Sequence, residues 1–289
     1  MLSSDRAVLS SGKIMDPSLN ETNSYQAFAD VYDELMSDVP YDRWTDRIDR
    51  DIKRYGISKT KAECAPDPES EEALLESERN LVADLGCGTG IITRKLHDLG
   101  YDVFGIDNSP EMLTRAFDSD EGRGIMYLNQ DMRELDLYST IGTAVCICDS
   151  LNYLTDDEDL EDAFAGISKF LYPGGLFIFD CNTSYKYREV IGESTIAEAG
   201  EDVSFIWENY YDEEENINEY DLTLFIKRSD GAYERAEETH FQRGIEAADI
   251  ERLSVECGLE IVSILDSETE EEVTDKTERI YAILRKKEN

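Results

Sequence analysis

From residue 81 onward, short apolar runs alternate with segments of helical periodicity, and this alternation constrains the fold more than any other feature. The runs expected to form strands are 81–85, 103–106, 125–128, 144–148 and 176–179. Helical patterns lie between several of them, at 91–99, 110–117 and 160–171. Strands joined by helices pair in parallel through crossover connections, and apolar strands without polar alternation are buried on both faces. The pattern therefore predicts an α/β fold with a mostly parallel sheet and helices on both faces.

Residues 185–243 interrupt this alternation. Strand patterns rich in aromatic residues follow one another there without helices, at 205–207 and 210–211, 220–227 and 233–241. The pair Asp230-Gly231 favours a two-residue hairpin turn between the last two strands. We therefore expect an inserted antiparallel β-sheet over 185–243, which would act as a lid or substrate subdomain.

The two ends of the chain complete the domain division. Residues 1–24 show no clear periodicity and are expected to form a loose leader, whereas 25–55 has helical spacing broken at Pro40. Near the C-terminus a helix over 245–257 precedes two strands, which should pair antiparallel because no helix separates them. The main domain is thus expected to comprise 25–184 and 244–289, with an N-terminal helical lid.

Charge limits the partners that this acidic protein can have. It contains 66 acidic and 28 basic residues, a formal net charge of −38. A nucleic-acid binder neutralises phosphates with a basic stripe, and no such stripe is visible, so neither nucleic acid nor an anionic membrane is expected as a partner. The sequence lacks an apolar run long enough to cross a membrane, and 1–16 lacks a signal-peptide pattern. We therefore expect a cytoplasmic protein, as a monomer or homodimer.

Metal binding is not expected from the cysteines and histidines. The six cysteines form no C-x-x-C pair, and only His97 and His240 could add imidazole ligands. Zinc sites usually require four such ligands at characteristic spacings. We therefore expect no metal site.

A glycine-rich loop follows the first expected strand, in the run Asp84-Leu85-Gly86-Cys87-Gly88-Thr89-Gly90. Its spacing differs from the G-x-G-x-x-G fingerprint of dinucleotide-binding folds. Glycines at these positions let the backbone approach a ligand that carries no phosphate. A tight strand-to-helix turn would also account for the loop.

Four aspartates fall where expected parallel strands end. Asp84 precedes the glycine loop, and Asp107 follows about 20 residues after Gly86, where a carboxylate commonly binds ribose hydroxyls. Asp131 stands beside Met132, a pairing that can bind the edge and cover the face of an adenine ring. Asp149 follows the fourth strand. Any one of them could cap a loop, but together they indicate a ligand at the carboxyl edge of the sheet.

Residues 82–90, 105–112 and 130–132 together resemble the motifs of class I S-adenosylmethionine-dependent methyltransferases. The likeness extends from about residue 25 to 287. It implies a Rossmann-like seven-stranded sheet whose last strand is antiparallel. It also implies S-adenosyl-L-methionine as the cofactor and S-adenosyl-L-homocysteine as its product.

The resemblance also implies roles for the matching positions. Gly86 and Gly88 would pass beneath the methionine part of the cofactor, and Asp107 would hold the ribose. Asn108 and Met112 would lie near the adenine, which Asp131 and Met132 would bind, and Asp149 would lie near the sulfonium. The implied cofactor-binding set in this part of the chain is Asp84, Gly86, Cys87, Gly88, Asp107, Asn108, Met112, Gln130, Asp131, Met132 and Asp149.

A narrower likeness concerns the N-terminal aromatic residues and the expected insertion. Tyr25, Tyr32 and Trp44, together with the inserted sheet, resemble small-molecule methyltransferases such as glycine N-methyltransferase and the amino-sugar N-methyltransferases. In that group these parts roof the active site, so the three aromatics would close over the cofactor. Alternatively, they form an amphipathic helix face packed on the core. No residue set identifies the acceptor.

The expected reaction is in-line displacement of the methyl group by a small-molecule acceptor, an amine, which must be aligned and kept from water. Asp149 could orient the amine or accept its proton, with help from Tyr153, and His240 is a second candidate base. A structural histidine is the alternative for His240. Methylation of a protein or RNA, and a non-catalytic S-adenosylmethionine-binding module, remain competing functions. A nicotinamide dehydrogenase does not fit the glycine spacing.

Overall fold

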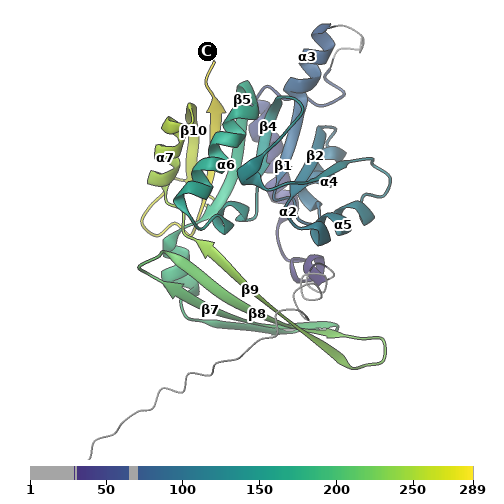
Figure 1. The fold of residues 1–289 in the computed structure, drawn as a ribbon, viewed down its shortest axis with the longest axis vertical. Helices are drawn as coiled ribbons and strands as arrows, with labels where there is room; N and C mark the ends of the chain where they lie inside the picture. The colour runs from purple at the N-terminus through teal and green to yellow at the C-terminus, as the bar shows by residue number, and fades with distance from the viewer. Residues whose placement is uncertain (1–28, 30, 65–70, 289) are drawn as a thin grey trace, which may run out of the picture.

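The computed structural model describes residues 29, 31–64 and 71–288, which form two β-sheets with helices around the larger one (Figure 1). The larger sheet has seven strands in the order β10-β11-β5-β4-β1-β2-β3. Their bounds are β1 Leu81–Leu85, β2 Asp102–Asp107, β3 Met126–Asn129, β4 Ile141–Cys146, β5 Leu171–Asn182, β10 Leu259–Asp266 and β11 Arg279–Lys286. β1 to β5 pair in parallel, whereas β11 is antiparallel to both of its neighbours. The fold expected from the sequence is confirmed, including the antiparallel last strand.

Helices cover both faces of this sheet and bury a separate core on each. The helices are α2 Tyr41–Tyr55, α3 Glu71–Asn80, α4 Ile91–Asp98, α5 Pro110–Asp118, α6 Asp157–Phe170 and α7 Ala247–Glu256. On one face, side chains of α6 and α7 pack around the buried phenylalanines of the sheet. On the other face, Ile48 and Ile52 of α2 pack with Ile92 and Leu96 of α4. The central strands β1, β4 and β5 are thus buried on both sides, as their uninterrupted apolar runs predict, whereas the edge strand β3 leaves Met126 57% exposed.

Local sequence signals fix the turns that carry the site. β2 ends at Asp107, and the Ser109 hydroxyl then accepts a hydrogen bond from the Met112 backbone nitrogen. Pro110 occupies the first position of α5, where its missing N–H is not needed. Because the helix starts so soon after the strand, the Asp107 side chain stays at the carboxyl edge of the sheet.

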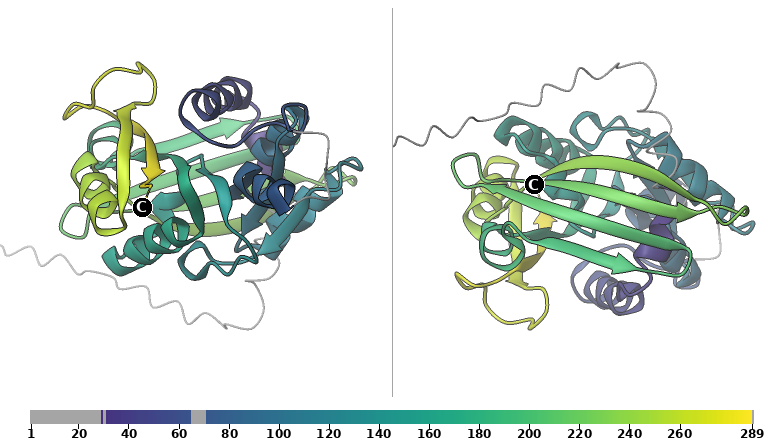
Figure 2. Two further views of the ribbon diagram at one scale, coloured as in Figure 1. Left: turned by 90° about the horizontal axis from the view of Figure 1, so that it is seen from above. Right: turned by 90° about the horizontal axis from the view of Figure 1, so that it is seen from below.

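The second sheet has four antiparallel strands, β6 Thr195–Ala199, β7 Val203–Asp212, β8 Ile217–Lys227 and β9 Tyr233–Arg243. It lies across one end of the seven-stranded sheet (Figures 1 and 2). Val203, Leu222, Leu224 and Ala236 bury one face of it against Val31 of the N-terminal segment. The insertion expected over 185–243 is therefore a sheet, as the pattern predicts.

Several details of the insertion differ from the prediction. β7 is one continuous strand, and β6 and the π-helical turn η3 Lys186–Ile191 had no recognised signal. The prediction of a two-residue turn at Asp230-Gly231 is wrong, because β8 ends at Lys227 and β9 begins at Tyr233. The longer connection is closed by a hydrogen bond from the Arg228 nitrogen to the Ala232 carbonyl oxygen.

The expected leader 1–24 and Tyr25 lie outside the described residues. In the part of the chain that is described, no helix is both long and apolar enough to cross a lipid bilayer.

Candidate active site

The glycine loop after β1 combines a close approach with an open surface. Gly86 and Gly88 have φ values of 64° and 53°, which favour glycine. A Cβ added to Gly86 would lie 2.6 Å from the Ser150 side chain, whereas one added to Gly88 would meet nothing within 4 Å. The first glycine is therefore required by packing against the turn η2 Ser150–Tyr153. The second lines free space, where a ligand could approach the backbone.

Asp107 fixes the conformation of this loop. Its carboxylate accepts hydrogen bonds from the backbone nitrogens of Gly88 at 2.7 Å and Ser109 at 2.8 Å. Burial raises the pKa of Asp107, and these backbone donors oppose the rise. A carboxylate has about four lone-pair sites, so Asp107 can still accept hydrogen bonds from a ligand.

Two other loop residues make supporting contacts. Asp84 is buried and accepts a hydrogen bond from the Thr93 hydroxyl at 2.5 Å, and burial raises the pKa of Asp84 to about 7. The Cys87 sulfur lies against Gly105, since a Cβ there would be 2.8 Å from it. Both residues brace the loop, and their contact with a cofactor stays a prediction.

The residues after β3 are partly engaged by their neighbours. Gln130 bonds through its side-chain amide to the backbone of Asp136, at 3.0 Å and 3.1 Å. Asp131 accepts hydrogen bonds from the Arg133 guanidinium, which lower the pKa of Asp131. The Met132 methyl group lies 3.5 Å from the position of a Cβ on Gly86. Met132 therefore lies beside the glycine loop, and Arg133 competes for the carboxylate that was expected to bind adenine.

The two predicted adenine neighbours at the start of α5 differ in exposure. Asn108 is exposed, and Met112 is half-buried. Their positions after β2 place them at the same edge of the sheet as Asp107, and their contacts with adenine stay predictions.

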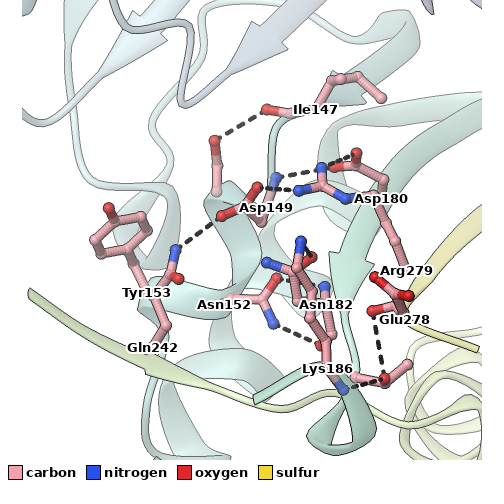
Figure 3. A network of polar contacts seen from close by, with 12 residues as sticks. Ile147, Asp149, Asn152, Tyr153, Asp180, Asn182, Lys186, Gln242, Glu278 and Arg279 are labelled. Atoms are coloured by element: carbon pink, nitrogen blue, oxygen red, sulfur yellow. Dashed lines mark hydrogen bonds and ion pairs between the residues drawn. The ribbon is translucent and has the colours of Figure 1, made fainter. Parts of the chain in front are cut away.

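Asp149 is the centre of a buried polar network (Figure 3). Its carboxylate accepts hydrogen bonds from Arg279 at 2.6 Å and from the Gln242 side-chain amide at 2.9 Å. Arg279 also donates to Asp180 at 2.6 Å, and Asp180 in turn accepts from the Asp149 backbone nitrogen at 2.9 Å. Burial opposes ionisation of Asp149, but the charges of Arg279 and Lys186 outweigh it and lower the pKa of Asp149. The carboxylate is thus a fixed anion and a weak base.

The backbone at Asp149 is itself unusual. Cys148 and Asp149 have φ values of 68° and 51°, in the left-handed region that non-glycine residues seldom adopt. Such conformations typically cost about 1–3 kcal/mol each and persist where surrounding contacts determine them. The bonds to Asp180, Arg279 and Gln242 supply those contacts.

The four-stranded sheet places a second group of polar side chains beside Tyr153, at the carboxyl edge of the seven-stranded sheet. The Tyr153 hydroxyl lies 2.8 Å from the Tyr220 hydroxyl and 3.3 Å from His240 Nδ1. His240 Nε2 lies 3.1 Å from a carboxylate oxygen of Glu238, and the His240 ring stacks on Tyr220 with centroids 4.8 Å apart. Tyr153 and His240, both predicted as candidates, therefore meet. Tyr220 and Glu238 were not predicted.

The N-terminal aromatics lie close to this network. Burial raises the pKa of Tyr32, and the charges of Cys148, Tyr153 and Asp149 add to the rise. The Arg279 guanidinium lies 5.6 Å from the centre of the Trp44 ring. Tyr32 and Trp44 are thus near the candidate site, and their role as a cover stays a prediction.

A hydrogen bond ties the N-terminal segment to the glycine loop. The Thr89 hydroxyl donates to Asp33 at 2.5 Å. No group of three or more histidine, cysteine, aspartate or glutamate side chains that could hold a metal ion occurs among the described residues.

Comparisons with known proteins agree with this geometry. Residues 82–175 match a family described as a methyltransferase domain. YqeM of Bacillus subtilis, provisionally named a methyltransferase, is 35% identical over 259 residues, which cover 89% of this chain and 95% of the relative. The crystal structure of an S-adenosylmethionine-dependent methyltransferase from Clostridium acetobutylicum has a TM-score of 0.75 and 27% identity, covering 91% of this chain and 99% of that one. A glycine/sarcosine N-methyltransferase of Halorhodospira halochloris is 29% identical over 155 residues, 52% of this chain and 54% of its own length.

Proposed function

Since this chain belongs to the class I S-adenosylmethionine-dependent methyltransferases, we propose that its acceptor is a small polar amine held beneath the four-stranded sheet. One observation carries the proposal: the sheet bonds directly to the candidate site, through Gln242 to Asp149 and through His240 to Tyr153. A sheet bonded this closely to the site would favour a small molecule over a macromolecule. The glycine/sarcosine N-methyltransferase relative supports an amine.

The residues around the glycine loop fit the cofactor. Space is free above Gly88, and Asp107 retains lone pairs while two backbone nitrogens hold it in place. Met132 lies at the side of the same loop and offers an apolar surface. When bound there, S-adenosylmethionine supplies a methyl group on a sulfonium, activated for displacement by a nucleophile.

The fixed anion at Asp149 aligns the acceptor amine. Because Arg279 lowers the pKa of Asp149, this carboxylate orients the amine rather than taking its proton. Alignment of reacting groups can supply about 7–11 kcal/mol of a barrier.

The amine proton leaves along the pair Tyr153 and His240. Burial raises the pKa of Tyr153, so its hydroxyl stays protonated and relays a proton instead of acting as a phenolate base. The amine gives a proton to the Tyr153 oxygen, and the Tyr153 proton moves to His240 Nδ1, which lies 3.3 Å away. Glu238 holds the opposite ring nitrogen at 3.1 Å and stabilises the resulting imidazolium.

The experiment is a transfer assay with methyl-labelled S-adenosylmethionine. The purified protein is offered small primary and secondary amines in one series, and folded protein and RNA in another. We expect label in small amines, with release of S-adenosylhomocysteine. Label recovered in RNA or protein would refute the proposal, as would tight cofactor binding with no transfer to any amine.

The role of the relay is tested separately. Tyr153→Phe should reduce turnover while leaving the affinity for S-adenosylmethionine within about twofold. A general acid–base group typically contributes about 10²–10⁴-fold to a rate, so a Tyr153→Phe enzyme with an unchanged rate would remove Tyr153 from the mechanism.

A further inference from the structure

The inward-facing side chains of β7, β8 and β9 form one continuous surface, which we call the roof face. Buried and exposed residues alternate along these strands, so every second side chain points inward. Strand pairing puts Trp207, Leu222 and Glu238 in one row across the sheet, and places Tyr220 beside His240 in the next. The roof face therefore extends from the Trp207 row to the residues that contact Tyr153.

The roof face holds polar atoms that have no hydrogen-bond partner in the described part of the chain. Among the described residues, six buried side-chain nitrogen or oxygen atoms lack a hydrogen bond, and three of them belong to Trp207, Asn218 and Glu238. Buried polar groups are nearly always hydrogen-bonded, and leaving one unpaired costs about 1–3 kcal/mol. Three such atoms on one face, next to the candidate site, point to a ligand that completes them.

The chemistry of the three atoms restricts that ligand. Trp207 Nε1 can only donate a hydrogen bond, whereas Asn218 Oδ1 and Glu238 Oε1 can only accept one. A hydroxyl group does both. The aromatic rings of Trp207 and Tyr220, with centroids 5.2 Å apart, offer an apolar surface to the carbon skeleton beside such a group.

The same face disfavours a carboxylate. Along β7, β8 and β9, all within the described residues, the inward positions carry no lysine or arginine. Glu238 instead places a carboxylate there, with its side chain only 2% exposed. A second carboxylate would be repelled in this low-dielectric setting.

We infer that the acceptor is a hydroxylated amine, recognised through its hydroxyl group by Trp207 and Glu238, and that amino acids are rejected. The inference rests on the proposed function, because it places the amine at Asp149 and Tyr153 and the hydroxyl at the roof face. Val31 and Leu35 pack over this part of the sheet, so the hydroxyl reaches it when the 31–35 segment moves aside.

The test compares matched ligands on the full-length protein saturated with S-adenosylhomocysteine. Calorimetric titration measures the affinity for 2-aminoethanol, for ethylamine, which lacks the hydroxyl, and for glycine, which replaces it with a carboxylate. A second pair is 2-amino-1,3-propanediol and isopropylamine. We expect each hydroxylated amine to bind about tenfold tighter than its partner, as one satisfied hydrogen bond would give, and glycine to bind weakest.

Two variants assign the preference to the roof face. Trp207→Phe removes the donor and keeps an aromatic ring, so the preference for the hydroxylated amine should fall toward onefold while the affinity for ethylamine stays unchanged. Glu238→Gln should improve the relative affinity for glycine. The control is Tyr210→Phe, a side chain of the same strand that is 70% exposed; it should alter none of these ratios.

Equal affinities within each pair, a preference for glycine, or no binding of either hydroxylated amine would overturn the inference. Methyl transfer is measured on the same preparations. Transfer to amines without a hydroxyl preference would refute the hydroxyl assignment alone, whereas label appearing only in RNA or protein would refute the proposed function as well.

Discussion

Replacing Arg279 should destabilise the protein more than the loss of an ordinary ion pair. Its guanidinium lies 2.6 Å from a carboxylate oxygen of Asp149 and 2.6 Å from one of Asp180. The Arg279 side chain is 15% exposed, and those of Asp149 and Asp180 are 18% and 3% exposed. Arg279→Met keeps an apolar stem but leaves two carboxylates close together without their counter-ion. Removing one partner of a buried pair costs about 3–5 kcal/mol, and we expect a loss of unfolding free energy in that range.

The loss should be measured by urea unfolding at pH 7.5 and again at pH 5. Arg279 lowers the pKa of Asp149 in the folded state, so its stabilising effect is present above the unfolded pKa and is lost as pH falls through the folded pKa. In Arg279→Met, burial raises the pKa of Asp149 and only Lys186 and Gln242 oppose the rise, so the protonated form becomes more accessible as pH falls. The difference in stability between the two proteins should therefore shrink at the lower pH.

Two further variants test the reasoning. Arg279→Lys keeps a charge but cannot reach both carboxylates with one planar fork, so its loss should be intermediate. Arg285 lies on the same strand and pairs with Glu260 at 3.0 Å in a partly exposed bridge. Arg285→Met should cost less than about 1 kcal/mol. Equal losses of stability in Arg279→Met and Arg285→Met would refute this prediction.

Three other predictions concern the cofactor, pH and metal. Asp107→Ala should weaken binding of S-adenosylmethionine by about 1–3 kcal/mol in a calorimetric titration, and unchanged affinity would contradict the ribose assignment. The pKa of Asp84 is about 7 in the folded protein, against about 3.9 in the unfolded chain. Its contribution to the free energy of unfolding is therefore lost as pH rises from roughly 4 to 7. Between roughly pH 4 and 7, the unfolding free energy of Asp84→Asn, measured in urea, should therefore fall by about 4 kcal/mol less than that of the wild-type protein. An identical pH dependence in both proteins would disprove the pKa shift of Asp84. Methyl transfer should be unaffected by a chelator, since the described residues gather no metal-ligand cluster; activity lost with chelator and restored by magnesium would contradict this.

The central sheet could be predicted because its signals are local. Apolar strands, the glycine loop and the Ser109-Pro110 helix start each act over a few residues, and each expected strand end carried its aspartate to the carboxyl edge. The reason for Gly86 was not local. It comes from Ser150, which a Cβ on Gly86 would approach to 2.6 Å.

The site residues that were not predicted are brought together by contacts between residues far apart in the sequence. Gln242 meets Asp149 across 93 positions and Arg279 meets it across 130, and neither residue belongs to a recognisable motif. Tyr220 and Glu238 lie on two strands that were expected to pair, but the register of that pairing could not be predicted. The alternation itself marks which residues of β8 and β9 share a face with His240, and it could have suggested both.

Local competition also limited the prediction of the adenine residues. The pair Asp131 and Met132 was expected to bind the ring, yet Arg133 two positions later donates to both oxygens of Asp131. The carboxylate can still accept a hydrogen bond, since it has lone pairs beyond those in use. Binding at this position therefore has to compete with Arg133, which the motif alone does not indicate.

The structure also indicates where a preference for cationic acceptors would arise. Asp149 and Asp180 share Arg279, and Lys186 acts on Asp149 as a second cation. Two anions and two cations nearly balance there. Glu238 is paired with His240 instead of a lysine or arginine, and one of its oxygens is unbonded. If the acceptor is selected by charge, the selection should therefore follow substitutions at Glu238 on the inserted sheet, while substitutions at Asp149 should act mainly on turnover.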